Sequence, residues 1–320
     1  MKSPVIAAAI VAAATGAHLP ALAHGFAGKR FFPATIATDD PFVADELSLP
    51  TVSTQRIDAS NDEPPTRQKS IEAEVSKRIT NDFGISLGLA HQRITAQGQP
   101  TVSGDGNVEL GFKLQLHKDE ARESLVAVGL GWEIGGSGSR AVGESVSTYT
   151  PTFYFGKGFG NLPDSSSLLR PFAVTGTFGV SFPSRASTVT TSIDPDTGAT
   201  TAGTELHPNV LQIGLAIEYS LPYLQSVVRD GGLTAPFDRM IPIVEIALER
   251  PLNRVDDRRF AGSINPGVLW AGRYVQLGLE AIIPINRRSG SGVGAVVQLH
   301  FFLDDIFPRS FGRPLFGGGS

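Results

Sequence analysis

The sequence predicts an all-β fold, a transmembrane antiparallel up-and-down β-barrel of about twelve strands. The first observation is strict alternation of apolar and polar residues, which is clearest from Val108 to Leu116 and again from Val126 to Ile134. The second is that this alternation continues over about ten residues, the length that a tilted strand needs to cross a bilayer. The third is the lack of any apolar run approaching about 18 residues, so the sequence predicts no spanning helix.

Composition agrees with this fold and excludes several other classes. Of 320 residues, 41% are hydrophobic and the mean hydropathy is +0.02, as expected when only alternate strand residues meet lipid. The chain has no cysteine, which excludes disulfides, thiolate metal sites and thiol nucleophiles. The net charge of −4 gives no basic face for nucleic acid, so we expect no nucleic-acid partner.

The N-terminus has the features of an export signal. Lys2 precedes an apolar run from Val5 to Ala14, and Ala21-Leu22-Ala23 provides a small-residue cleavage site. We therefore expect a cleaved signal peptide over 1–23 and location in the outer membrane of a Gram-negative bacterium. The remaining chain divides into a periplasmic N-terminal segment over 24–45, the barrel over 46–308 and a tail over 309–320.

Eleven segments carry the alternating pattern, and a twelfth is needed because bacterial barrels of this type have even strand numbers. Glu46–Asp58 is the candidate for the twelfth strand. The other segments, in chain order, are 71–79, 84–94, 106–117, 124–135, 149–158, 170–182, 209–221, 241–250, 262–270, 273–285 and 293–304.

Connection lengths predict which ends of the strands face the periplasm, because such barrels have short periplasmic turns and longer extracellular loops. Thr80–Phe83 and Lys118–Glu123 are short, whereas Thr95–Asp105 and Gly136–Thr148 are long. This alternation predicts that both termini are periplasmic. Pro222–Met240 is the exception, a long connection in the periplasmic series.

The signal peptide, the alternating strands and a last strand reading GAVVQLHFFLDDIF resemble a bacterial outer-membrane family named for the meta pathway of phenol degradation. The resemblance covers about 45–308 and implies a porin-like barrel that acts as a transporter. It carries no catalytic motif and implies no cofactor. Most outer-membrane barrels end on an aromatic residue that the barrel-assembly machinery reads, whereas here Phe307 is followed by Pro308–Ser320.

The residues between the apolar positions of each strand are expected to face the lumen. This inward set is rich in acids, and a ring of carboxylates favours cations. The alternative is that these acids pair with basic residues and fill space. The candidate lumen and selectivity residues are Glu72, Glu74, Arg78, Glu109, Lys113, Glu133, Glu218, Glu245, Glu249, Glu280 and His300.

Arginine pairs in two expected extracellular loops are candidates for contact with lipopolysaccharide phosphates, with solvated loop charge as the alternative. These residues are Arg258, Arg259, Arg287 and Arg288. Asp194–Gly198 only faintly resembles a calcium loop, and His300 has no second histidine at ligand spacing, so we predict no metal site.

His91 ends an outward row, and an outward histidine is a possible part of a lipid hydrolase on the barrel wall. The sequence places no serine beside it on the apolar face and contains no G-x-S-x-G motif, so we predict no enzyme.

The leading hypothesis is a channel or transporter for small solutes with a polar, acid-rich lumen. The alternatives are a closed barrel with a receptor or lipid-contacting structural role, a lipid enzyme, and a soluble secreted β-domain. Outer-membrane lipid, lipopolysaccharide and the assembly machinery are the expected partners.

Overall fold

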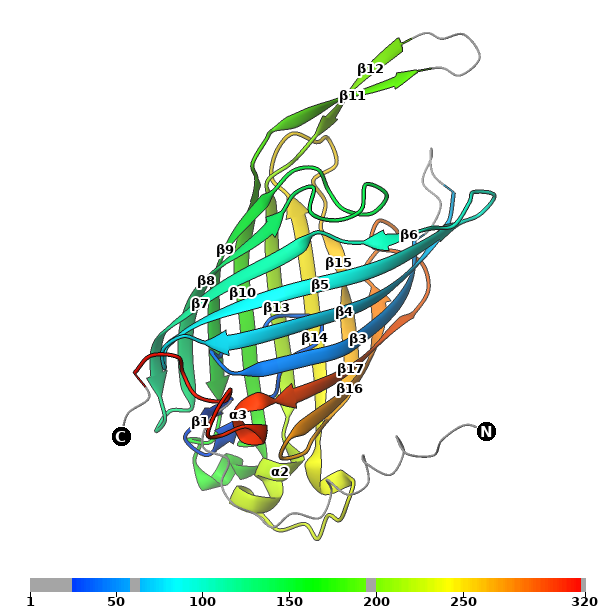
Figure 1. Cartoon of the computed structure of the whole chain (residues 1–320). Helices are drawn as coiled ribbons and strands as arrows, with labels where there is room; N and C mark the ends of the chain where they lie inside the picture. The colour runs from blue at the N-terminus through cyan, green and yellow to red at the C-terminus, as the bar shows by residue number, and fades with distance from the viewer. Residues whose placement is uncertain (1–24, 58–63, 194–199, 318–320) are drawn as a thin grey trace, which may run out of the picture.

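A computed structural model describes residues 25–57, 64–193 and 200–317. In this part of the chain twelve antiparallel strands close into a barrel, in which each strand pairs with the next and β17 pairs with β3 (Figure 1). The predicted fold class is therefore confirmed. The barrel strands are β3 (Glu46–Ile57), β4 (Thr66–Arg78), β5 (Phe83–Ala96), β7 (Val108–Asp119), β8 (Ser124–Ile134), β9 (Thr148–Gly158), β10 (Phe172–Pro183), β13 (Val210–Tyr219), β14 (Met240–Pro251), β15 (Ala261–Ala271), β16 (Val275–Pro284) and β17 (Gly294–Phe302).

The period-two pattern separates the two faces of the barrel wall, because successive side chains of a strand point to opposite sides. Val75 and Leu87 lie opposite one another on β4 and β5, point outward and are exposed, and half-buried Leu110 lies opposite Leu87 on β7. One residue away along each strand, Glu74, Gly88 and Glu109 form the matching inward row. The outward row is exposed apolar surface of the kind that a bilayer covers.

The two ends of the barrel differ in their connections (Figure 1). At one end, residues 79–82, 120–123 and 272–274 make short turns, and we call this the short-turn end. Two longer connections at the same end hold short helical turns, η2 (Asp164–Leu169) and α2 (Leu221–Tyr223) with η3 (Leu224–Val228) and η4 (Phe237–Arg239). The first of these, 159–171, is a second long connection that the sequence analysis did not single out.

The opposite end, which we call the long-loop end, carries the longer loops. Its most prominent feature is a hairpin of β11 (Ser187–Ile193) and β12 (Thr200–Leu206), which extends beyond the barrel (Figure 1). A short strand, β6 (Val102–Asp105), folds back onto β5. No helix in the described residues is long and apolar enough to span a membrane.

The N-terminal segment, residues 25–45, packs against the inside of the barrel wall. It includes β1 (Phe26–Ala27) and β2 (Arg30–Phe31) and folds into the barrel at the short-turn end. Phe32 and Phe42 pack with Leu125, and Ile36 packs against the cluster that contains Ile241 and Leu269. The hydrophobic effect explains this position, because these inward apolar side chains of the strands would otherwise face water. The predicted signal peptide, 1–23, lies outside the described residues.

Candidate functional site

A cavity of about 1050 Å³ occupies the barrel between the N-terminal segment and the long-loop end. Its wall consists of inward-facing residues of the strands, and its floor is formed by residues 34–40 and 42–44. We call this space the lumen cavity. A drug-sized ligand would fit such a volume, since small-molecule sites span about 300–1,000 Å³.

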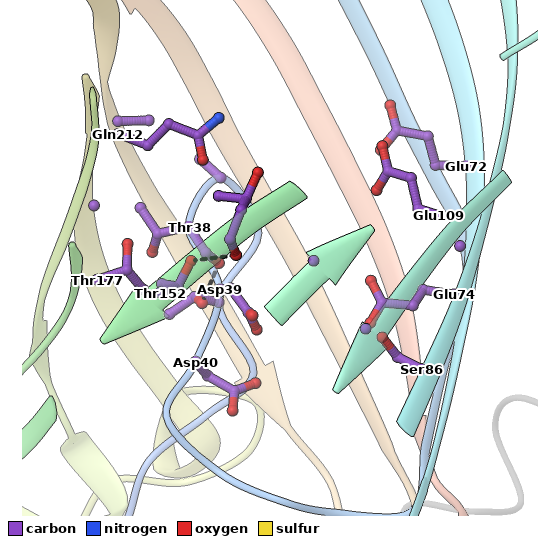
Figure 2. Close-up of a pocket in the computed structure, with 18 of the residues that line it drawn as sticks. Thr38, Asp39, Asp40, Glu72, Glu74, Ser86, Glu109, Thr152, Thr177 and Gln212 are labelled. Carbon is purple, nitrogen blue, oxygen red and sulfur yellow. Dashed lines mark hydrogen bonds between the residues drawn. The ribbon is translucent and has the colours of Figure 1, made fainter. Parts of the chain in front are cut away.

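One wall of the lumen cavity is strongly acidic. The strand register places Glu74 opposite Gly88, Gly88 opposite Glu109, and Glu109 opposite Glu133, so three glutamates lie on one level around a glycine. Glu72 lies two residues above Glu74 on the same strand (Figure 2). Thr152, Thr177 and Gln212 line the facing wall and carry no charge (Figure 2).

The floor of the lumen cavity adds further acids and one lysine. Lys113 Nζ donates to Asp39 Oδ1 at 2.9 Å and to the Asp40 carbonyl oxygen at 2.6 Å, and it lies 4.8 Å from the Tyr154 ring centroid. The only other Lys or Arg among the described lining residues is Arg288. The described lining contains eight acidic residues and these two basic ones. The acidic residues are Asp39, Asp40, Glu46, Glu72, Glu74, Glu109, Glu133 and Glu249.

The structure divides the lumen residues predicted from the sequence into two groups. Those that line the lumen cavity are Glu72, Glu74, Glu109, Lys113, Glu133, Glu249 and His300. Glu218, Glu245 and Glu280 are instead buried and do not line it, with at most 3% of each residue exposed. The sequence analysis could not separate the two groups, because it placed the N-terminal segment outside the barrel.

Glu245 attaches residues 36–38 of the N-terminal segment to the barrel wall. Its carboxylate accepts hydrogen bonds from the backbone amides of Ile36, Ala37 and Thr38 at 2.7, 3.0 and 2.7 Å, and from the Thr38 hydroxyl at 2.7 Å. Charge-assisted bonds of this kind are stronger than neutral ones. The expected selectivity residue Glu245 therefore holds the segment in place and is shielded from solutes.

A second anchor, which the sequence analysis missed, surrounds Arg30. The Arg30 side chain is fully buried, and its Nε lies 3.3 Å from Glu123 Oε2. Nη1 donates to the Pro171 carbonyl at 2.8 Å, Nη2 donates to the Arg170 carbonyl, and the guanidinium lies 3.8 Å from the Tyr223 ring centroid. We call Arg30, Glu123 and Tyr223 the arginine clasp.

The arginine clasp joins the N-terminal segment to three connections of the short-turn end. Tyr223 donates its hydroxyl to Glu123 Oε1 at 2.7 Å, and the Gly160 amide donates to Glu123 Oε2 at 2.9 Å. Burial and the hydrogen bond to Glu123 raise the pKa of Tyr223 to about 12. Glu123 has a φ of 49°, a left-handed conformation that is uncommon outside glycine.

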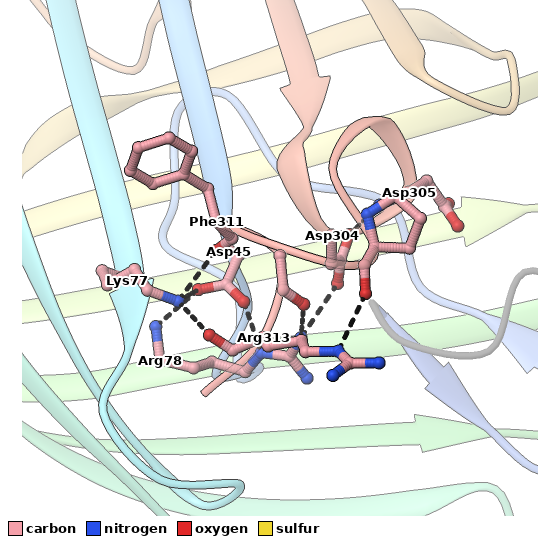
Figure 3. Close-up of polar contacts among 9 residues, drawn as sticks. Asp45, Lys77, Arg78, Asp304, Asp305, Phe311 and Arg313 are labelled. Carbon is pink, nitrogen blue, oxygen red and sulfur yellow. Dashed lines mark hydrogen bonds and ion pairs between the residues drawn. The ribbon is translucent and has the colours of Figure 1, made fainter. Parts of the chain in front are cut away.

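Arg78 belongs to a third anchor and does not line the lumen cavity. Its Nε donates to Asp45 Oδ2 at 2.9 Å, and Lys77 Nζ donates to Asp45 Oδ1 at 2.6 Å (Figure 3). The same two side chains donate to backbone carbonyls of the tail, Arg78 to Gly312 at 2.9 Å and Lys77 to Phe311 at 2.9 Å. The tail, which begins after α3 (Leu303–Ile306), is thereby attached to β4.

The loop arginines lie at the long-loop end, and two of them engage one aspartate. Arg259 donates to both Asp257 oxygens at 2.9 Å, and Arg288 Nη1 lies 3.5 Å from Asp257 Oδ2. The hydrogen bonds from Arg259 hold the pKa of Asp257 well below its usual range. Arg258 donates to the Val255 carbonyl at 3.2 Å. The possible calcium loop, Asp194–Gly198, lies outside the described residues.

Around His91 the structure differs from the expectation that no serine lies beside it. Residues 102–105 were assigned to a loop, but they form β6 and pair with β5. This pairing brings Ser103 and Asp105 to His91. Val102 and Ser103 alternate in the way strand residues do, but four residues are too few for that pattern to be informative.

Comparison with known proteins supports the fold. No family model and no curated protein matches the chain. Among solved structures, the COG4313 outer membrane channel from Pseudomonas putida F1 has a TM-score of 0.55 at 11% identity, covering 85% of this chain and 99% of that one. The NanC porin gives 0.44 at 10% identity over 79% and 98%, and the KdgM porin gives 0.40 at 12% over 78% and 98%.

At this identity, the similarity to the COG4313 channel establishes the fold alone. The other two TM-scores lie below 0.5 and add no argument. The resemblance to the phenol meta-pathway family stays a prediction, since no family model matches. The chain has the fold of an outer-membrane β-barrel.

Proposed function

We propose that this protein is an outer-membrane channel that passes small solutes and prefers cations. The observation that carries the proposal is the lumen cavity, which sets eight acids against two bases inside a closed barrel. Carboxylates that line a narrow aqueous space raise the local concentration of cations and exclude anions. Lys113 does not cancel this effect, because Asp39 already accepts from it.

The expected export signal and the exposed apolar rows of the strands support location in the outer membrane. In this orientation the long-loop end faces outward, and the loop arginines lie near lipopolysaccharide. Asp257 competes with lipopolysaccharide phosphate for Arg259 and Arg288. Arg258 and Arg287 would therefore be the first to contact the phosphate. Assembly would require the barrel-assembly machinery that inserts such proteins.

A closed barrel with a receptor or structural role is the second candidate. The N-terminal segment favours it, because its apolar side chains pack inside the barrel on two hydrophobic clusters. A segment held in this way fills the short-turn end and narrows any path from the lumen cavity to the periplasm.

Ion conductance of refolded protein in a planar bilayer distinguishes these functions. We expect cation selectivity, read from the reversal potential under a salt gradient. The triple variant Glu74→Gln, Glu109→Gln, Glu133→Gln should lose most of that selectivity, because it removes the acids of one level. Glu205→Gln, on the exposed hairpin, is the matched control and should behave like the wild type.

Folding of each variant is checked by heat-modifiable migration in detergent gels. A folded wild-type barrel that conducts no ions would overturn the channel proposal and favour the closed-barrel role. A triple variant with unchanged selectivity would show that the acids of this level do not select the ion.

A further inference from the structure

Three polar side chains meet on the outer face of the barrel, where β6 pairs with β5. His91 Nδ1 lies 2.7 Å from Asp105 Oδ1, and His91 Nε2 lies 2.9 Å from Ser103 Oγ. The antiparallel register places Asp105 directly opposite His91 and Ser103 opposite Arg93, so all four residues share the outward face. None of them lines the lumen cavity.

The carboxylate of Asp105 sets the direction of its hydrogen bond with His91 and the tautomer of a neutral imidazole. An ionised carboxylate only accepts, so His91 Nδ1 carries the proton and donates to Asp105. The lone pair of Nε2 then faces Ser103, whose hydroxyl donates to it. Ser103 has a single hydroxyl proton, and the Gln92 carbonyl, 3.2 Å from Ser103 Oγ, is the alternative acceptor for it. Serine, imidazole and carboxylate in this order form the arrangement that activates a serine nucleophile.

The position of the three residues on the wall indicates a substrate. Along β5 the outward residues Leu87 and Leu89 are 39% and 51% exposed, and His91 and then Arg93 follow them toward the long-loop end. On β4, exposed Lys69 lies opposite Arg93. From the apolar belt upward, the wall therefore presents apolar side chains, then His91 and Asp105 on one level, and then Ser103, Arg93 and Lys69 together on the next.

A membrane lipid likewise presents its acyl chains first and its ester carbonyls and phosphate beyond them. Arg93 lies directly opposite Ser103 on the neighbouring strand, and Lys69 lies opposite Arg93, so the three residues form one row with about 5 Å from strand to strand. This separation suits a lipid whose ester reaches Ser103 while its phosphate binds Arg93 and Lys69. Charge-assisted hydrogen bonds from arginine to phosphate are among the strong ones in proteins.

We propose that Ser103, His91 and Asp105 form a catalytic triad that hydrolyses acyl esters of phosphate-bearing membrane lipids on the outer wall of the barrel. Ser103 Oγ attacks the ester carbonyl carbon while His91 Nε2 takes its proton. The bond from that carbon to the alcohol oxygen breaks, His91 returns the proton to the leaving oxygen, and the acyl group stays on Ser103.

A water molecule completes the cycle. It attacks the acyl carbon, gives its proton to His91, and releases the fatty acid, and Ser103 Oγ recovers the proton from His91. Asp105 does not touch the substrate but positions the imidazole and stabilises its charged form. The proposed hydrolysis takes place on the outer wall alone. Its tests are therefore independent of those of the channel proposal.

The first test is labelling of the refolded full chain in detergent with a long-chain alkyl fluorophosphonate. Ser103 Oγ would bond to phosphorus as fluoride leaves, and mass spectrometry would locate the adduct. We expect a single adduct on Ser103, none in Ser103→Ala, and labelling slowed by roughly 10²–10⁴ in His91→Ala, the usual contribution of a general base. Thr95→Ala, one row above on the same face, should label like the wild type.

The three side chains are largely exposed, so these variants should fold, and heat-modifiable migration checks this. Wild-type protein that takes up no label, or label that persists in Ser103→Ala, would overturn the triad. Asp105→Asn tests positioning: it should reduce labelling less than His91→Ala and shift its pH profile. An unshifted profile would contradict the role of Asp105.

The second test measures fatty acid released from mixed micelles. One arm contains phosphatidylglycerol, one contains lipid A, and one contains a diacylglycerol that lacks phosphate. We expect release from one or both phosphate-bearing lipids, which identifies the source of the substrate, and a raised KM in Arg93→Ala. Release from no lipid, or equal release from diacylglycerol, would overturn the assignment of a phosphate-bearing lipid.

Discussion

The substitution Arg30→Ala should lower the free energy of unfolding by about 3–5 kcal/mol, the usual cost of removing one partner of a buried ion pair. The variant leaves Glu123 buried without its cation and leaves the Pro171 carbonyl without its Arg30 donor. It also detaches the N-terminal segment from the connections of the short-turn end. Denaturant titration of the protein in lipid vesicles, followed by tryptophan fluorescence, measures the loss.

Arg229→Ala is the matched control, since Arg229 is exposed on one of the same connections. It should change stability by less than about 0.5 kcal/mol. Arg30→Lys keeps the charge but loses the planar fork, so its stability should fall between those of the wild type and Arg30→Ala. A stability of Arg30→Ala equal to that of the control would contradict the anchoring role.

The strands were predictable because a period of two is a direct consequence of strand geometry. The alternation in β7 and β8 indicates which side chains meet lipid, and the register of Leu110 and Trp132 agrees with it. The even strand number and the alternating connections then gave the twelfth strand, β3, although its own pattern is weak. These features are local in sequence, so a single chain reveals them.

Which inward acids line the lumen cavity and which are buried could not be predicted in this way. The outcome depends on contacts between residues that are distant in the sequence. The contacts of Glu245 with residues 36–38 span more than 200 positions. One signal was available. Ile241, Ile243 and Leu269 are apolar and share the inward parity of Glu245, which a water-filled lumen would not favour. Inward apolar residues at one end of a barrel indicate that another segment covers them there.

The triad was missed for a related reason. His91 was recognised as an outward histidine, but its partners lie on β6, a strand of four residues. Ser103 and Asp105 come from a connection that length alone assigns to an extracellular loop. Only the pairing of β6 with β5 places them beside the histidine. Function on a short edge strand of this kind leaves little trace in the sequence pattern.

Gly84→Val should abolish most of the ion conductance, because Gly84 lines the lumen cavity beside Val43 of the N-terminal segment. A Cβ atom built at Gly84 would lie 2.9 Å from Val43 Cγ1, which leaves no room for a side chain. A second cavity of about 450 Å³ lies beyond this point and shares only Phe42 and Val43 with the lining of the lumen cavity. Any solute that passes from one cavity to the other must therefore pass these side chains.

The reverse change, Val43→Gly, should raise conductance several-fold, because it removes the side chain that faces Gly84. The double variant Val43→Gly, Gly84→Val should recover conductance toward the wild-type value, since contacting residues show coupled effects. Gly88→Ala is the control: it lies four residues further along β5 on the same inward face, and its Cβ would meet Glu109 Cβ at an ordinary 3.4 Å. Equal conductance in Gly84→Val and Gly88→Ala would exclude a passage at Val43 and would require ions to cross the N-terminal segment elsewhere.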